Sequence, residues 1–136
     1  MKIEAISDKA WNELRVRPFI VIGFHAHQSQ VIAVATNDEG ICVLKIIDDS
    51  HSARQDFFSK ISMSYKGSPI AVSNRKTERF LKNFFEEKMR KNTALKITLK
   101  GPEEKLGNWK FEIESAFLRQ KKIMFSADNP IQYLDL

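Results

Sequence analysis

The sequence contains little cysteine and no long apolar run. Cys42 is the single cysteine among 136 residues, so the chain cannot form an internal disulfide, and this composition suits a reducing compartment. No apolar stretch approaches the roughly 20 residues that a membrane-spanning helix needs. Residues 1–14 also lack the apolar segment of a signal peptide. We therefore expect a cytoplasmic protein that makes no contact with a membrane.

The motifs of the common catalytic sites are missing as well. The sequence has no nucleophile elbow, phosphate-binding P-loop, dinucleotide-binding glycine motif, zinc-protease motif or CxxC pair. Cys42 lies within an apolar run, where a thiol is expected to be buried and inert. Asp48 and Asp49 are adjacent carboxylates, but they lie at the start of an expected helix, where capping accounts for them. We therefore expect no catalytic site, no bound metal and no cofactor.

What the sequence does contain is the composition of a soluble globular protein. Apolar residues make up 43% of the chain and charged residues 29%. There is no internal repeat and no linker rich in proline, glycine or serine. A chain of this length can bury a core without a metal or a disulfide. We therefore expect a single globular domain over residues 1–136.

The apolar patterns predict a mixed α/β domain. Residues 19–24 form a continuous apolar run rich in β-branched side chains, which is typical of a strand buried on both faces. Asn37 and Gly40 supply turn residues, so residues 19–47 are predicted to form a three-stranded antiparallel meander. The predicted elements are strand 2–6, helix 8–15, strands 19–24, 30–36 and 41–47, helix 48–65, strand 68–73, helix 74–91, strand 94–100, and strands 109–119 and 123–127.

Within residues 19–99, the predicted order resembles that of ribonuclease-H-like folds. In both cases three antiparallel strands are followed by a helix, a strand, a helix and a strand. The resemblance rests on element order alone, and no family motif accompanies it. Nucleases with that fold hold divalent cations through strand carboxylates, and the predicted strands 19–24 and 68–73 contain none. The resemblance therefore extends to the fold and not to nuclease activity.

Two histidines, His25 and His27, follow the predicted strand 19–24. If the strand continued, both side chains would point to the same side and could bind one metal ion. A zinc site needs a third or fourth ligand, however, and nothing in the sequence identifies one. We interpret the two histidines as polar residues of a loop that begins near Phe24 and leads to Gln28.

The predicted helix 74–91 has two distinct faces. Apolar residues recur at intervals of three and four and indicate a face that packs into the core. These residues are Phe80, Leu81, Phe84, Phe85 and Met89. The opposite side carries Arg75, Arg79, Lys82 and Arg90.

Positive charge is concentrated in the later part of the chain. Residues 1–50 carry a net charge of −2 and residues 51–136 a net charge of +7, which together give the formal +5. Such asymmetry often marks a surface that binds polyanions, although a solvated basic surface is the simpler interpretation. The candidate phosphate-binding residues are Arg75, Lys76, Arg79, Lys82, Arg90, Lys91, Lys96, Lys100, Arg119, Lys121 and Lys122.

The predicted function is non-catalytic, accessory binding of nucleic acid through backbone phosphates, with DNA favoured over RNA. Aromatic residues are expected at core positions and no known nucleic-acid-binding motif is present, so base stacking and sequence reading are not indicated. The alternative is a protein–protein interaction adaptor or assembly subunit, which self-associates as a homodimer through a C-terminal hairpin of strands 109–119 and 123–127. The apolar tail 129–136 is expected to dock on the domain or on a partner.

Overall fold

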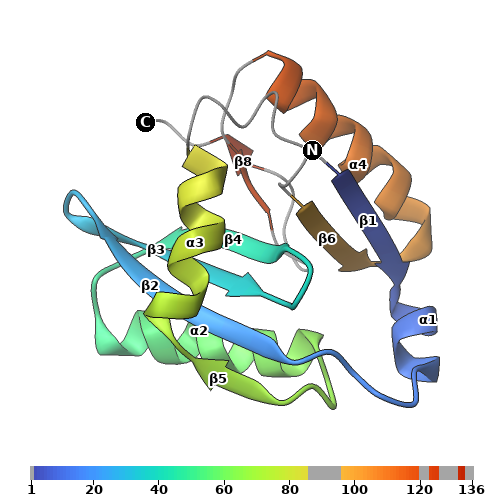
Figure 1. The fold of residues 1–136 in the computed structure, drawn as a ribbon, viewed down its shortest axis with the longest axis horizontal. Coiled ribbons are helices and arrows are strands. Elements are labelled where there is room, and N and C mark those ends of the chain that lie inside the picture. The colour runs from blue at the N-terminus through green and yellow to red at the C-terminus, as the bar shows by residue number, and fades with distance from the viewer. Residues whose placement is uncertain (1, 86–95, 120–122, 126–131, 134–136) are drawn as a thin grey trace.

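The computed structural model describes residues 2–85, 96–119, 123–125 and 132–133, and a six-stranded mixed sheet lies at its centre (Figure 1). The strand order across the sheet is β1-β6-β4-β3-β2-β5. β3 runs antiparallel to both of its neighbours, and every other adjacent pair is parallel. The strands are Lys2–Ser7 (β1), Ile20–His27 (β2), Gln30–Thr36 (β3), Ile41–Ile47 (β4), Ile70–Val72 (β5) and Lys96–Gly101 (β6).

The predicted antiparallel meander is confirmed as β2, β3 and β4. Asn37 makes the turn between β3 and β4, because its Oδ1 accepts hydrogen bonds from the backbone N–H groups of Glu39 and Gly40 over 2.8 and 2.9 Å. Gly40 also lies against the backbone of Lys96, where a side chain would collide. A glycine is therefore required where β4 begins beside β6.

The place of β6 in the sheet is not evident from the order of elements along the chain. Rather than extending the sheet beyond β5, β6 pairs with β1 along six residues and with β4 where Ile41 meets Ile97. The N-terminal strand β1, which lies outside residues 19–99, supplies this partner. The mixed α/β fold is as predicted, but the ribonuclease-H-like order is not confirmed.

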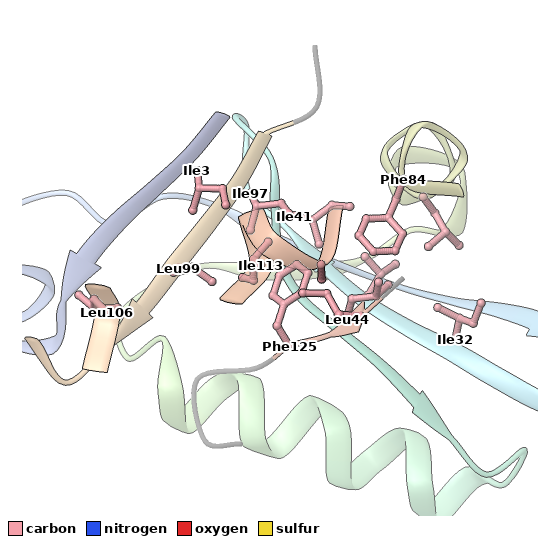
Figure 2. Close-up of a cluster of buried hydrophobic side chains, with 14 residues drawn as sticks. Ile3, Ile32, Ile41, Leu44, Phe84, Ile97, Leu99, Leu106, Ile113 and Phe125 are labelled. Carbon is pink, nitrogen blue, oxygen red and sulfur yellow. The ribbon is translucent and has the colours of Figure 1, made fainter. Parts of the chain in front are cut away.

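Helices cover both faces of the sheet and produce two apolar cores (Figure 1). One core receives Trp11, Phe57 and Ile61 from α1 and α2, and the other receives Phe84 and Ile113 from α3 and α4 (Figure 2). Because both faces are buried, the central strands are continuous apolar runs. The helices are Asp8–Glu13 (α1), His51–Ser64 (α2), Asn74–Phe85 (α3) and Glu103–Leu118 (α4).

The first two helices begin where their capping residues predict. Ser7 Oγ accepts the backbone N–H of Ala10 over 3.1 Å, and Ser50 Oγ accepts that of Ala53 over 3.1 Å. Each serine therefore satisfies a helix N–H group that has no partner within the helix.

Residues 109–119 were predicted as a strand, and this prediction is wrong because residues up to Leu118 belong to helix α4. The alternation of Trp109, Phe111 and Ile113 suggested a strand, but Phe111 is 69% exposed. The buried side chains instead recur at a helical spacing, with Leu106 and Ile113 seven residues apart. Two acidic residues in the first turn, which favour a helix start, were the missed signal.

A C-terminal hairpin is present, but it is built from other residues than predicted because 109–119 is helical. Phe125 pairs with Leu44 of β4 through two reciprocal backbone hydrogen bonds of 2.9 Å. Ile123 and Phe125 are buried against the domain. Of the tail 129–136, which was expected to dock, the structure describes residues 132 and 133, so that prediction stays a prediction. The hairpin consists of Ile123–Met124 (β7) and Gln132–Tyr133 (β8).

Candidate nucleic-acid interface on helix α3

The first turn of α3 is attached to the centre of the sheet by hydrogen bonds. The backbone N–H of Ser73 donates to the carbonyl of Ile22 over 2.8 Å, and Asn74 Oδ1 accepts the backbone N–H of Phe24 over 2.8 Å. Ser73 Oγ also accepts the N–H of Lys76 over 3.3 Å, as a capping side chain does. These contacts join β5, β2 and α3, so the orientation of α3 on the sheet is defined.

Close packing between β2 and α3 depends on Gly23. A side chain at this position would collide with the buried hydroxyl of Thr77. That hydroxyl lies 3.2 Å from two backbone carbonyls of the preceding turn and 2.8 Å from His25 Nε2, with which it forms a hydrogen bond whose direction depends on the tautomer of the imidazole. His25 is therefore a structural residue that links β2 to α3.

His25 and His27 belong to β2, so the prediction that they lie in a loop is wrong. β2 continues this far because β3 pairs with it until His27 meets Gln30. His25 is half-buried, and the loss of hydration lowers its pKa, against the opposing effect of the Glu78 carboxylate. A pKa below the ordinary value of about 6.5 means that His25 is mostly neutral at pH 7 and adds little positive charge. Among the residues that the structure describes, no three His, Cys, Asp or Glu side chains are grouped so as to hold a metal ion.

The inner face of α3 contributes to the core as predicted. Leu81 and Phe84 are buried, and the ring of Phe84 meets an aromatic ring of α4 edge to face with the centroids 5.6 Å apart. Figure 2 shows Phe84 pointing from α3 into the apolar cluster on this side of the sheet. Phe80 is partly buried at the border of the cluster. The side chain of Phe85 and all of Met89 lie outside the described part of the chain.

The outer face of α3 carries four exposed cations. Arg75, Arg79 and Lys82 recur at i, i+4 and i+7, so they lie along the side opposite the buried residues, with Lys76 beside them. Glu78 is the one acidic residue between positions 74 and 85. None of the four cations forms an ion pair with another described residue. The predicted basic face of this helix is thus exposed over residues 75–82.

The structure does not gather the other candidate cations on this surface. Lys96 and Lys100 share a side of β6, and Lys100 faces α1 and α2, on the opposite side of the sheet from α3. Lys100, a candidate phosphate-binding residue, is 9% exposed and its Nζ lies 2.6 Å from Asp8 Oδ1, so it is buried in an ion pair and is not part of an exposed basic surface. β6 is an internal strand with α1 packed beside it, and this placement buries Lys100.

Arg119 is exposed at the end of α4. The candidates outside the described residues are Arg90, Lys91, Lys121 and Lys122.

Three residues that position α3 were missed by sequence reasoning. Gly23 within an apolar strand is a signal for close approach of another element, and Asn74 at the first position of an amphipathic helix is of a residue type that is frequent at helix starts. Thr77 has no comparable signal, because its partner His25 is 52 residues away in the sequence.

Cys42 is buried in the core, as predicted. Burial raises the pKa of its thiol to about 11, and Sγ lies 3.1 Å from Thr98 Oγ1. The thiol is therefore protonated at pH 7, and a protonated thiol is a poor nucleophile.

Comparison with known proteins found no matching family model, no matching curated protein and no matching solved structure. Over the described residues, no helix combines the length and the apolar character needed to cross a membrane. The function of the chain is therefore inferred from its own surfaces, among them the outer face of α3 with its four exposed cations.

Proposed function

We propose that this protein is a non-catalytic accessory protein that binds the backbone phosphates of nucleic acid, DNA in preference to RNA, through the outer face of α3. The observation that carries the proposal is the row of Arg75, Arg79 and Lys82, which is exposed and has no ion-pair partner among the described residues. A cation that is already paired with a carboxylate must break that pair before it binds a phosphate. These three side chains need no such exchange.

The spacing of the row suits a phosphate backbone. A helix rises ~1.5 Å per residue, so Arg75 and Lys82 lie about 10 Å apart along the axis of α3. Phosphates of one strand of B-DNA follow one another at ~3.4 Å along the duplex axis. The row therefore extends over about three phosphate steps of one strand. Because Phe84 and Thr77 anchor the inner face, α3 presents these cations from a rigid support.

Contact with bases is not part of the proposal. Proteins that bind single strands use exposed aromatic rings on which bases stack. Phe80 is partly buried, and the guanidinium of Arg79 lies over its ring at 5.3 Å from the centroid. We therefore expect duplex DNA to bind more tightly than single strands, with little dependence on base sequence.

A salt series of binding measurements tests the proposal. Labelled duplex DNA, single-stranded DNA, duplex RNA and single-stranded RNA are titrated with the protein, and binding is followed by fluorescence anisotropy. Four neutralised phosphates give a slope of about −3.6 for log K against log salt concentration on duplex DNA. If none of the four nucleic acids binds at about 50 mM salt, the proposal is wrong.

A specific observation favours a second candidate function, that of a protein–protein interaction adaptor or assembly subunit. Phe111 and Leu118 of α4 are 69% and 85% exposed, and they line one shallow surface together with Ser115. Ile123 and Phe125 of the C-terminal region are already buried within the chain. In this candidate a homodimer forms through α4 rather than through the side chains of the hairpin.

Sedimentation equilibrium tests the second candidate. A dimer in the unmodified protein that dissociates when Phe111→Ser and Leu118→Ser are combined would support it. A protein that is monomeric at all concentrations would exclude the homodimer.

A further inference from the structure

A cleft of about 650 Å³ separates α1 from α2, on the face of the sheet opposite α3. Its volume is within the range of roughly 300–1,000 Å³ that is usual for clefts that bind small molecules. The buried side chains of Trp11 and Lys100 lie at its base, and the exposed side chains of Asp56 and Lys60 lie at its rim. Residues from two helices and a strand therefore converge on this one cavity.

The base of the cleft holds the ammonium group of Lys100. Nζ lies 2.6 Å from Asp8 Oδ1, 5.9 Å from the ring centroid of Trp11 and 5.6 Å from that of Tyr65. The faces of aromatic rings attract cations, so both rings and the Asp8 carboxylate stabilise the charge. An ammonium group has three N–H donors, and Asp8 is the one described residue that accepts a hydrogen bond from it. The geometry leaves donors of Lys100 for a molecule that enters the cleft.

The unequal burial of the charges determines which ligand the cleft favours. The side chains of Asp8 and Asp56 are 47% and 65% exposed, so water hydrates both carboxylates, whereas that of Lys100 is 9% exposed. The charge with the least hydration gains most from a further partner, because Coulomb interactions are stronger in a low-dielectric environment. Lys60 and Lys66 add two more ammonium groups to the lining, of which that of Lys60 is paired with Asp56 over 3.1 Å at the exposed rim. An anion is therefore favoured over a cation.

We propose that the cleft between α1 and α2 binds a small organic anion whose carboxylate or phosphate oxygens accept hydrogen bonds from Lys100. Lys60 and Lys66 attract the anion to the rim. Met63 is 70% exposed beside them, and its flexible thioether can contact the apolar part of the ligand. The site is on the other face of the sheet from α3, so it does not depend on nucleic-acid binding.

Calorimetric titration of the whole chain with inorganic phosphate, adenosine monophosphate and glutarate tests the proposal. Ser59→Glu places a carboxylate on the wall of the cleft and is expected to weaken binding by about tenfold or more. Gln55→Glu adds the same charge to an exposed position of the same helix outside the cleft, and it is the matched control. Binding of at least one anion, weakened by Ser59→Glu alone, supports the site.

Asp8→Asn gives a second signature that a merely structural role would not produce. The substitution removes the carboxylate that competes for Lys100, so the melting temperature without ligand falls while the anion binds about tenfold more tightly. Saturating anion then restores much of the lost melting temperature.

Three results would overturn the proposal. The first is that none of the three anions binds at millimolar concentration. The second is that Ser59→Glu and Gln55→Glu weaken binding equally. The third is that binding disappears when Arg75, Arg79 and Lys82 are changed to Glu, since this would locate the anion on α3 instead of in the cleft.

Discussion

The cations on the outer face of α3 and the ammonium group of Lys100 have the same charge in opposite surroundings. Lys82 is exposed and has no ion pair among the described residues, whereas Lys100 is buried against two aromatic rings and pairs with Asp8. An exposed cation adds little to the stability of the fold but can bind a phosphate. A buried and paired cation contributes to the stability of the fold, and it can bind only a molecule that enters its cleft. Position in the fold, and not residue type, separates the two roles.

The origin of this difference is the number of sides on which each element is covered. α3 packs on the sheet through one face, so its other face remains in solvent. β6 lies between β1 and β4, with α4 on one face and α1 beside the end of the other. A lysine on β6 is therefore enclosed even though it alternates with apolar residues as a solvent-facing residue would. Four experiments can sharpen or break this comparison.

The largest effect is expected for the inner face of α3. Phe84→Ala removes a fully buried ring and should lower the free energy of unfolding by about 3–5 kcal/mol, because the cavity cannot close completely. Phe111→Ala is the matched control, since Phe111 is 69% exposed and should change stability by less than about 0.5 kcal/mol. Urea denaturation of both variants measures the difference. Equal losses in the two variants would contradict the assignment of an inner face.

Substitution of the two lysines by methionine tests the comparison directly. Lys100→Met should lower the free energy of unfolding by about 1–3 kcal/mol, below the usual figure for a broken buried pair because Asp8 is half-exposed and can be hydrated. Lys82→Met should change it by less than about 0.5 kcal/mol. Thermal melts followed by circular dichroism distinguish the variants. If Lys82→Met is the more destabilising, the roles assigned to these lysines are reversed.

Charge reversal on the outer face of α3 should alter binding and leave folding nearly unchanged. Exposed pairs contribute only ~0–1 kcal/mol, so the combined variant Arg75→Glu, Arg79→Glu and Lys82→Glu should remain folded. Each lost phosphate contact reduces the salt slope by about one unit, so the slope should flatten by about three units and affinity should fall strongly.

A control variant distinguishes an effect of the cations on α3 from an effect of the net charge of the protein on nucleic-acid binding. Lys9, Lys105 and Lys110 are exposed on α1 and α4, and their change to Glu alters the net charge equally. Binding that is weakened as much by this control would mean that net charge, rather than the face of α3, attracts the nucleic acid.

The smallest effect is expected for His25. Burial lowers its pKa, so the unfolded chain binds a proton more readily than the folded protein. Stability is therefore fully present above the unfolded value of about 6.5 and decreases as pH falls below it. His25→Gln keeps a side chain that can donate to or accept from Thr77 and removes the titration, so its melting temperature should depend less on pH between about 7 and 5.5. Identical pH profiles for both proteins would show that His25 is not coupled to folding.

Local structure was largely predictable because its causes lie within a few residues. Ser7 and Ser50 cap helices through N–H groups three residues away, and Asn37 makes its turn through N–H groups two and three residues ahead of it. The amphipathic pattern of α3 likewise depends on intervals of three and four residues. Such signals are present in any short window of the sequence.

α4 shows where such a window is insufficient. Trp109, Phe111 and Ile113 alternate as in a strand, yet the same segment also has apolar residues at helical spacing. Both periods fit over so short a stretch. Packing determines that this segment is a helix and not a strand, because Leu106 and Ile113 are buried against the sheet while Phe111 remains in solvent.

The sequence by itself therefore determined the meander, the capped helices and a basic face on α3, because each depends on neighbouring residues. The tertiary structure alone decided that β6 joins β1, that Lys100 is buried beside Asp8, and that His25 binds Thr77. The residues of the last two pairs are 92 and 52 positions apart. Contacts over such separations follow from the order of strands in the sheet, which depends on how all the apolar faces are buried together and not on any local pattern.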